Sequence, residues 1–179
     1  MAIYYGDSSG GGDTTEGRIL QVQLTTKTDT FSSNSDSFTD LTGMSVSITP
    51  HHSGNKILII ASFCYGQSAD SYASGRLVRG STGLGVAPSA SYRTLCGFSM
   101  QDELYNGNNK LYSQTYTYLD HPNTTSSTTY KLQGRTYNGD GRSFCINRTL
   151  SDANASYLHR GESRICLLYT SPSPRDRYI

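Results

Sequence analysis

The stretch Met44-Ser45-Val46-Ser47-Ile48-Thr49-Pro50 alternates apolar and small polar residues and then meets a proline. A period of two residues places the apolar side chains on one face of a half-buried β-strand. Pro50 ends this strand, because proline has no amide hydrogen to donate to a neighbour. A turn at Ser53-Gly54-Asn55 then leads into residues 56–65, whose continuous apolar start predicts a central strand covered on both faces.

The same pattern of short strands separated by turns continues outward from this pair. Gly80-Ser81-Thr82-Gly83 predicts the four-residue loop of a hairpin. The remaining predicted strands are 19–24, 76–79, 84–87, 94–100, 111–119, 128–137, 143–147 and 162–165. No window has a helical period, and no internal repeat is found. We therefore predict an all-β fold, namely a two-sheet antiparallel β-sandwich of jelly-roll type.

The N-terminal residues differ in composition from the strand-forming part of the chain. Residues 1–17 contain the run Ser8-Ser9-Gly10-Gly11-Gly12 and predict a flexible leader or attachment segment before a sandwich domain at 18–165. The first residues lack the basic and apolar regions of a signal peptide. No apolar run approaches the roughly 18 residues that a membrane span needs. We expect neither a signal peptide nor membrane insertion.

The C-terminal residues 166–179 suggest a different origin. Residues 166–176 (CLLYTSPSPRD) resemble, codon by codon in one frame, the conceptual translation of a transposase-based sequencing adapter. This predicts a non-native, adapter-derived tail on a metagenomic reading frame, which would interrupt the last strand at residue 165. The alternative is a natural Ser/Pro-rich terminus. Residues 166–169 are apolar enough to prolong that strand, whereas Pro172 and Pro174 would end its pairing.

The composition and charge of the chain exclude some classes of function. The formal net charge is +1 and charged residues make up 16% of the chain, so we do not expect nucleic-acid binding. Mean hydropathy is -0.50, and the chain has 14 tyrosines and no tryptophan. A surface rich in Ser, Thr, Asn, Gly and Tyr suits an exposed β domain.

No catalytic, cofactor or metal site is predicted. Cys64, Cys96 and Cys145, which remain when Cys166 is set aside, are too widely spaced for a zinc site and are interpreted as buried free thiols within strands. Adjacent side chains such as His51 and His52 diverge on an extended segment, so an exposed turn is favoured over a metal site. Acidic residues are scattered over the predicted turns, and no nucleotide-binding or nucleophile motif is present. We expect no enzymatic activity.

Tyrosine is the one overused aromatic residue. Tyr112, Tyr116 and Tyr118 share one face of a predicted strand. A row of exposed tyrosines could stack on sugar rings or form subunit contacts, because each ring offers apolar area with a polar end. The alternative is that these rings cap a sheet that has no tryptophan and only five phenylalanines. We treat the three residues as a candidate glycan or subunit contact.

Eight segments of the chain can be compared with a known family: 17–23, 27–33, 37–50, 55–59, 76–79, 119–122, 128–133 and 160–163. These segments resemble virion-associated structural proteins of marine bacteriophages, which are usually taken as tail-fibre-like. The resemblance covers nearly all of residues 18–165. Members of that family close with an apolar strand, which this sequence lacks where the adapter-like residues begin.

The resemblance implies a non-enzymatic virion structural protein, either a tail-fibre-like or a receptor-binding β domain for host attachment. We expect a homo-oligomer, with a trimer favoured, assembled in the host cytoplasm with other virion proteins. A host surface glycan is a further candidate partner. Two alternatives remain open: a capsid decoration or head-fibre protein, and a carbohydrate-binding (lectin-like) or carbohydrate-active protein.

Overall fold

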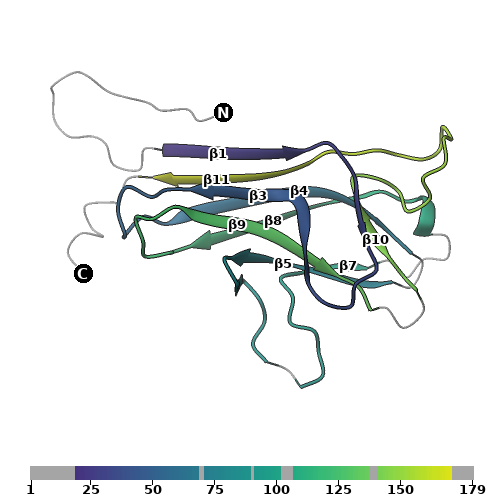
Figure 1. The fold of residues 1–179 in the computed structure, drawn as a ribbon, viewed down its shortest axis with the longest axis horizontal. Helices are drawn as coiled ribbons and strands as arrows, with labels where there is room; N and C mark the ends of the chain where they lie inside the picture. The colour runs from purple at the N-terminus through teal and green to yellow at the C-terminus, as the bar shows by residue number, and fades with distance from the viewer. Residues whose placement is uncertain (1–18, 69–70, 90, 102–106, 138–140, 171–179) are drawn as a thin grey trace.

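The structure is a computed structural model made almost entirely of β-strands (Figure 1). It describes residues 19–68, 71–89, 91–101, 107–137 and 141–170. One sheet contains β1 (Ile19–Lys27), β2 (Phe31–Ser33), β4 (Ile57–Gln67), β8 (Tyr112–Asp120), β10 (Phe144–Ile146) and β11 (Ser163–Thr170). The other contains β3 (Thr39–Ile48), β5 (Tyr72–Arg79), β6 (Thr82–Leu84), β7 (Phe98–Gln101) and β9 (Thr128–Arg135). A single turn of 3-10 helix, η1 (Gly107–Asn109), precedes β8.

The strand order is that of a jelly roll. In the first sheet β1 pairs with β11, β11 with β4, and β4 with β8; in the second β3 pairs with β9, β9 with β5, and β5 with β7. All these pairs are antiparallel. Numbering the eight main strands along the chain gives the orders 1-8-3-6 and 2-7-4-5, which define the double Greek key of this fold. The predicted fold class is confirmed.

The core lies between the two sheets and is built from alternate residues of each strand. Met44 and Ile48 of β3 and Ile57 and Ile59 of β4 are at most 2% exposed, as the alternation of the sequence predicted for β3. β4 is central, as expected, because β11 and β8 pair with its two edges. The expectation that β4 is covered on both faces is wrong, since Leu58 and Ile60 are only half-buried and Ser62 is exposed.

A buried polar cluster joins the two sheets. Tyr130 of β9 donates its hydroxyl to Asp120 Oδ2 of β8 at 2.6 Å, and Arg79 Nη1 of β5 donates to the same oxygen at 2.8 Å. Burial, followed by the hydrogen bond to Asp120, raises the pKa of Tyr130, so its hydroxyl stays protonated. Each polar group therefore has a partner, which is what burial of a carboxylate requires.

Strand boundaries differ from the sequence prediction where turn chemistry decides them. The hairpin between β5 and β6 has a two-residue turn, because Arg79 pairs with Thr82 and Gly80 takes a φ of 59°. Its second strand ends at Leu84 and not at residue 87. The strand predicted at 94–100 begins only at Phe98, and the short strand β2 was not predicted.

The last strand crosses the predicted domain end at residue 165. β11 pairs with β1 on one side and with β4 on the other, and both Leu167 and Tyr169 lie in the core, at most 1% exposed. Any residues with this apolar alternation would pair in the same way, so the adapter origin of 166–179 stays a prediction. Residues 171–179 and the predicted leader at 1–17 lie outside the described residues. Within the described part, no helix is long and apolar enough to cross a membrane.

The two adjacent leucines of β11 provide a matched test of this packing. Leu167→Ala should lower the free energy of unfolding by about 2 to 5 kcal/mol, because it leaves a cavity between the sheets. Leu168→Ala, on the half-buried outer face, should cost about 1 kcal/mol. Urea unfolding followed by circular dichroism measures both. Equal costs would show that residues 166–170 do not occupy this strand position.

Candidate binding site

One edge of the second sheet is interrupted by a loop. β6 and β7 both pair with β5, with Leu84 opposite Leu77 and Phe98 opposite Gly75. Residues 85–97, called the edge loop below, therefore leave the edge of β5 and return to it almost at the same place. A loop with such closely spaced ends belongs to the Ω class, which is frequently functional. In Figure 1 it is the teal segment that extends beyond β5 and β7.

Tyr116 of β8 binds the start of the edge loop and lies close to its end. The carbonyls of Leu84 and Gly85 lie 3.4 and 3.2 Å from the hydroxyl of Tyr116, which donates to them. Gly85 has a φ of 60°, and a Cβ at this position would lie 2.1 Å from the Tyr116 hydroxyl oxygen. A Cβ at Gly97 would lie 3.1 Å from the same oxygen. Glycine is required at position 85, where the φ is positive and a Cβ would collide with Tyr116, whereas a Cβ at position 97 would make a tight contact with the same hydroxyl.

The three tyrosines singled out from the sequence share one face of β8, as predicted, and that face points toward the core. Tyr112, Tyr116 and Tyr118 are half-buried and pack against the core cluster. Tyr112 stacks on Tyr65 at a centroid distance of 5.4 Å, and Tyr116 lies 5.3 Å from Phe98. Their packing thus matches the alternative reading, in which the rings cap a sheet. The glycan or subunit contact at these residues stays a prediction.

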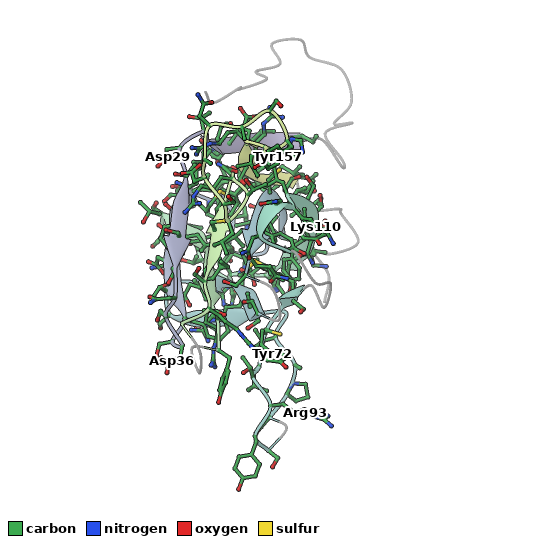
Figure 2. The ribbon with its side chains drawn as sticks, turned by 90° about the vertical axis from the view of Figure 1, so that its right-hand side faces the viewer. Asp29, Asp36, Tyr72, Arg93, Lys110 and Tyr157 are labelled. Carbon is green, nitrogen blue, oxygen red and sulfur yellow. The ribbon has the colours of Figure 1, made fainter. Side chains whose placement is uncertain are left out.

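A pocket of about 570 Å³ opens where the edge loop meets β5, β7 and the end of β9. We call it the edge pocket. Tyr72 and Tyr137 line it with rings 6.3 Å apart in an edge-to-face arrangement, and their side chains are 56% and 57% exposed. Figure 2 shows Arg93 on the part of the edge loop that extends away from the sandwich, and Tyr72 where this loop meets it.

The described residues that line the edge pocket carry positive charge. Arg93 comes from the edge loop and Arg135 from the end of β9, and none of the described lining residues is acidic. Arg135 Nη1 lies 3.3 Å from Thr94 Oγ1, to which it donates. Within the described residues, neither arginine pairs with a carboxylate. The guanidinium of Arg142 lies 5.6 Å from the centre of the Tyr72 ring, which adds a third cation beside the pocket.

On the sheet surface beside the edge pocket, the charged groups have partners within the sandwich. Asp40 of β3 accepts hydrogen bonds from Lys131 at 2.5 Å and from Gln133 at 2.7 Å. These bonds, that of Lys131 first, lower the pKa of Asp40. Arg76 lies 4.2 Å over the Phe38 ring and donates to Gln133 at 2.8 Å. A carboxylate with two donors is a structural acceptor and a poor general base.

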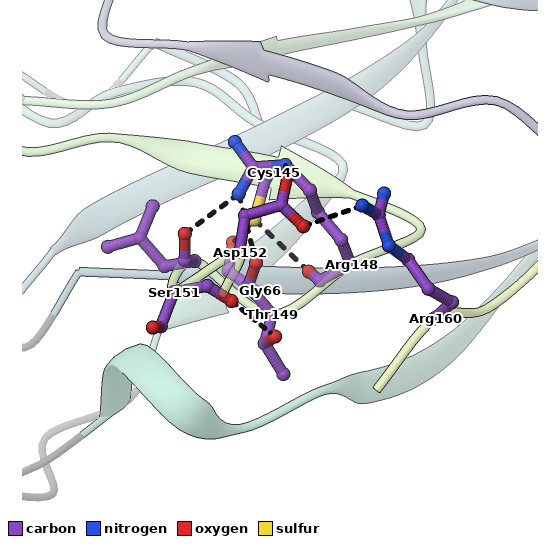
Figure 3. A network of polar contacts seen from close by, with 8 residues as sticks. Gly66, Cys145, Arg148, Thr149, Ser151, Asp152 and Arg160 are labelled. Atoms are coloured by element: carbon purple, nitrogen blue, oxygen red, sulfur yellow. Dashed lines mark hydrogen bonds and ion pairs between the residues drawn. The ribbon is translucent and has the colours of Figure 1, made fainter. Parts of the chain in front are cut away.

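The second polar cluster, around Cys145, is also structural (Figure 3). The Cys145 thiol is fully buried and donates to the carbonyl of Arg148 at 3.1 Å, and burial raises its pKa to about 11. A thiol of this pKa is protonated near neutral pH and is not a nucleophile. Arg148 donates to the carbonyl of Leu150 at 2.7 Å, while Asp152 pairs with Arg160 at 2.6 Å. The cluster holds the long connection before β11 against the sandwich.

The other residues considered from the sequence are placed as follows. All the cysteines are free, but only Cys145 is fully buried, and Cys96 lies in the edge loop and not in a strand as predicted. His51 and His52 are exposed in a turn. In the described part of the chain, no three His, Cys, Asp or Glu side chains come together in a way that could hold a metal ion.

The outer face of the first sheet carries an apolar stripe. Leu58 of β4 lies in register between Leu168 of β11 and Leu119 of β8, and Leu168 lies opposite Val22 of β1. The next row joins Leu24, Cys166 and Ile60. Leu119 is 57% and Leu24 is 47% exposed. We call these seven residues the outer stripe. Two of them, Cys166 and Leu168, lie in the adapter-like segment, and the other five belong to β1, β4 and β8.

Comparison with known proteins does not assign this chain to a family. No family model matches the chain, and no curated protein matches it. Similar solved structures include the D431N mutant VP2 protein of infectious bursal disease virus in T=1 particles, with 12% identity, a TM-score of 0.43, and coverage of 94% of this chain and 46% of that chain. A structure of the Gt strain of the same virus has 13% identity and a TM-score of 0.42, covering 97% of this chain and 49% of that one. This chain spans about half the length of those chains.

Two glycines with similar φ angles test how the edge loop is anchored. Gly80→Ala should cost roughly 1 to 2 kcal/mol from backbone strain alone, because nothing lies within 4 Å of the new Cβ. Gly85→Ala adds the collision with the Tyr116 hydroxyl and should cost about 1 to 3 kcal/mol more. It should also speed tryptic cleavage after Arg93. Urea unfolding and limited proteolysis measure these effects, and identical behaviour of the two variants would contradict the anchoring by Tyr116.

Proposed function

We propose that this chain is a non-enzymatic structural protein of a virus particle, namely a tail-fibre-like or receptor-binding β domain displayed on a bacteriophage. The observation that carries the proposal is a jelly-roll sandwich with a projecting loop at one edge. Jelly rolls occur in viral capsid proteins and lectins. Because a fold by itself does not determine function, the exposed edge loop and its pocket supply the site. The sequence resemblance to marine phage proteins supports the same role.

The polar groups of the described residues support a non-enzymatic role. The buried candidates for chemistry, Asp120 and Cys145, are engaged in hydrogen bonds that hold strands or loops together. Among the described residues, the edge pocket is lined by cations and aromatic rings and by no carboxylate. Glycoside cleavage ordinarily requires a pair of carboxylates across the bond. Binding without turnover is therefore the activity that this pocket favours.

We further propose that the domain forms a homo-oligomer, with a trimer favoured, through the outer stripe. The stripe is apolar in two adjacent rows, and its most exposed members, Leu24 and Leu119, lie on different strands. Contiguous exposed apolar area of this kind marks protein interfaces. Association through this face of the first sheet would leave the edge loop, which belongs to the second sheet, free to contact a host surface.

The virion role is tested on purified particles of the phage that encodes the chain. Mass spectrometry should find peptides of this protein in the particles, and immunogold labelling should lie at the tail. Labelling over the head would favour a capsid decoration or head-fibre protein. Absence of the peptides from particles that yield the major capsid protein would contradict both proposals.

The oligomer is tested by placing a charge on the outer stripe. Leu119→Lys should lower the mass measured by light scattering after size-exclusion chromatography toward that of one chain, because a buried ammonium ion would lack a partner. Thr115→Lys, exposed on the same strand outside the stripe, is the matched control and should leave the mass unchanged. A monomeric wild-type protein, or an unchanged mass for Leu119→Lys, would contradict assembly through this face.

A further inference from the structure

We infer that the edge pocket binds an anionic sugar residue, with the sugar ring against Tyr72 and Tyr137 and its acid group between Arg93 and Arg135. The inference rests on the proposed display of the domain on a particle, because it names the surface molecule that the domain would contact. It places the site on the second sheet and the edge loop and not at the tyrosines of β8.

The two tyrosines of the pocket are more exposed than the tyrosines of β8. Tyr72 and Tyr137 are each more than half exposed, whereas the tyrosines of β8 pack against the core. Two rings held edge-to-face 6.3 Å apart form an angled apolar surface. Such a surface fits the C–H face of a pyranose ring, and tyrosine presents it at a small cost in side-chain entropy.

The polar groups of the pocket select a negative charge. Arg93 and Arg135 approach it from the edge loop and from β9, and no described carboxylate neutralises either. An arginine guanidinium binds carboxylate, sulfate or phosphate through paired hydrogen bonds. Elsewhere on the same sheet Lys131 pairs with Asp40, and Arg76 donates to Gln133. Ser74 and Ser99 add hydroxyls that can bind sugar hydroxyls.

The size and position of the pocket agree with one or two sugar units of a longer chain. Its volume of about 570 Å³ lies within the range of roughly 300 to 1,000 Å³ typical of ligand sites. The pocket is open to solvent at the base of a projecting loop, so a polysaccharide could continue beyond it. The shared chemistry is an acidic pyranose, which a uronic acid or a sulfated galactose would supply.

The experiment measures binding of three tetrasaccharides to the purified full chain by calorimetry and ligand-observed NMR. Tetragalacturonate carries carboxylates, a carrageenan tetrasaccharide carries sulfates, and maltotetraose is neutral. At least one acidic probe should bind and maltotetraose should not, and the preferred acid identifies the source. Binding of no acidic probe, or equal binding of the neutral one, would overturn the inference.

Paired substitutions locate the binding. Arg93→Ala and Tyr72→Ala should each weaken binding of the acidic probe by about tenfold or more, because each removes a contact made directly to it. Tyr157→Ala and Arg164→Ala, which remove equally exposed side chains outside the pocket, should leave the affinity unchanged. Circular dichroism of each variant verifies folding, and Arg93 lies in an exposed loop where replacement does not disturb the core.

Full affinity in both pocket variants would overturn the site. The result is separable from the virion proposal, because peptides in purified particles and sugar binding by the isolated chain are independent measurements. If the protein is present in virions but binds none of the probes, the proposed sugar ligand is refuted and the virion role is not.

Discussion

β1 reaches the rest of its sheet only through β11, which lies between it and β4. Among the described strands, β11 comes last along the chain. The first and third main strands of the jelly roll, β1 and β4, are therefore joined only when residues 163–170 are in place. The side chains of Leu167 and Tyr169 then close the core from this side. On its other side β4 pairs with β8, which presents Tyr116 to the edge loop.

The sequence predicted the fold class because the alternation of Met44, Val46 and Ile48 reports directly on a half-buried strand. Strand ends were less predictable, because they depend on backbone conformation. Gly80 and Gly85 both adopt positive φ, yet one makes a tight turn and the other starts a loop. A local pattern does not distinguish these outcomes, which are decided by the pairing of β5 with two separate partners.

The site was harder to predict than the fold. The two-residue period of a β-strand places Tyr112, Tyr116 and Tyr118 on one face of β8. It does not indicate whether that face points toward the core or toward solvent. The edge pocket draws Tyr72, Arg93 and other residues from segments far apart in the sequence, and only the return of the chain to the edge of β5 brings them together. No spacing rule in the sequence could have indicated that set.

The edge loop also makes the domain tolerant of change. Its ends are fixed on neighbouring positions of one strand, so insertions between Gly85 and Gly97 need not shift the sheet register. Each doubling of a flexible loop costs only about 0.6 kcal/mol in closure entropy. The sandwich can therefore carry loops of different length and sequence at this edge on an unaltered scaffold. Such an arrangement would let the loop sequence diverge while the proposed assembly surface on the opposite sheet stays constant.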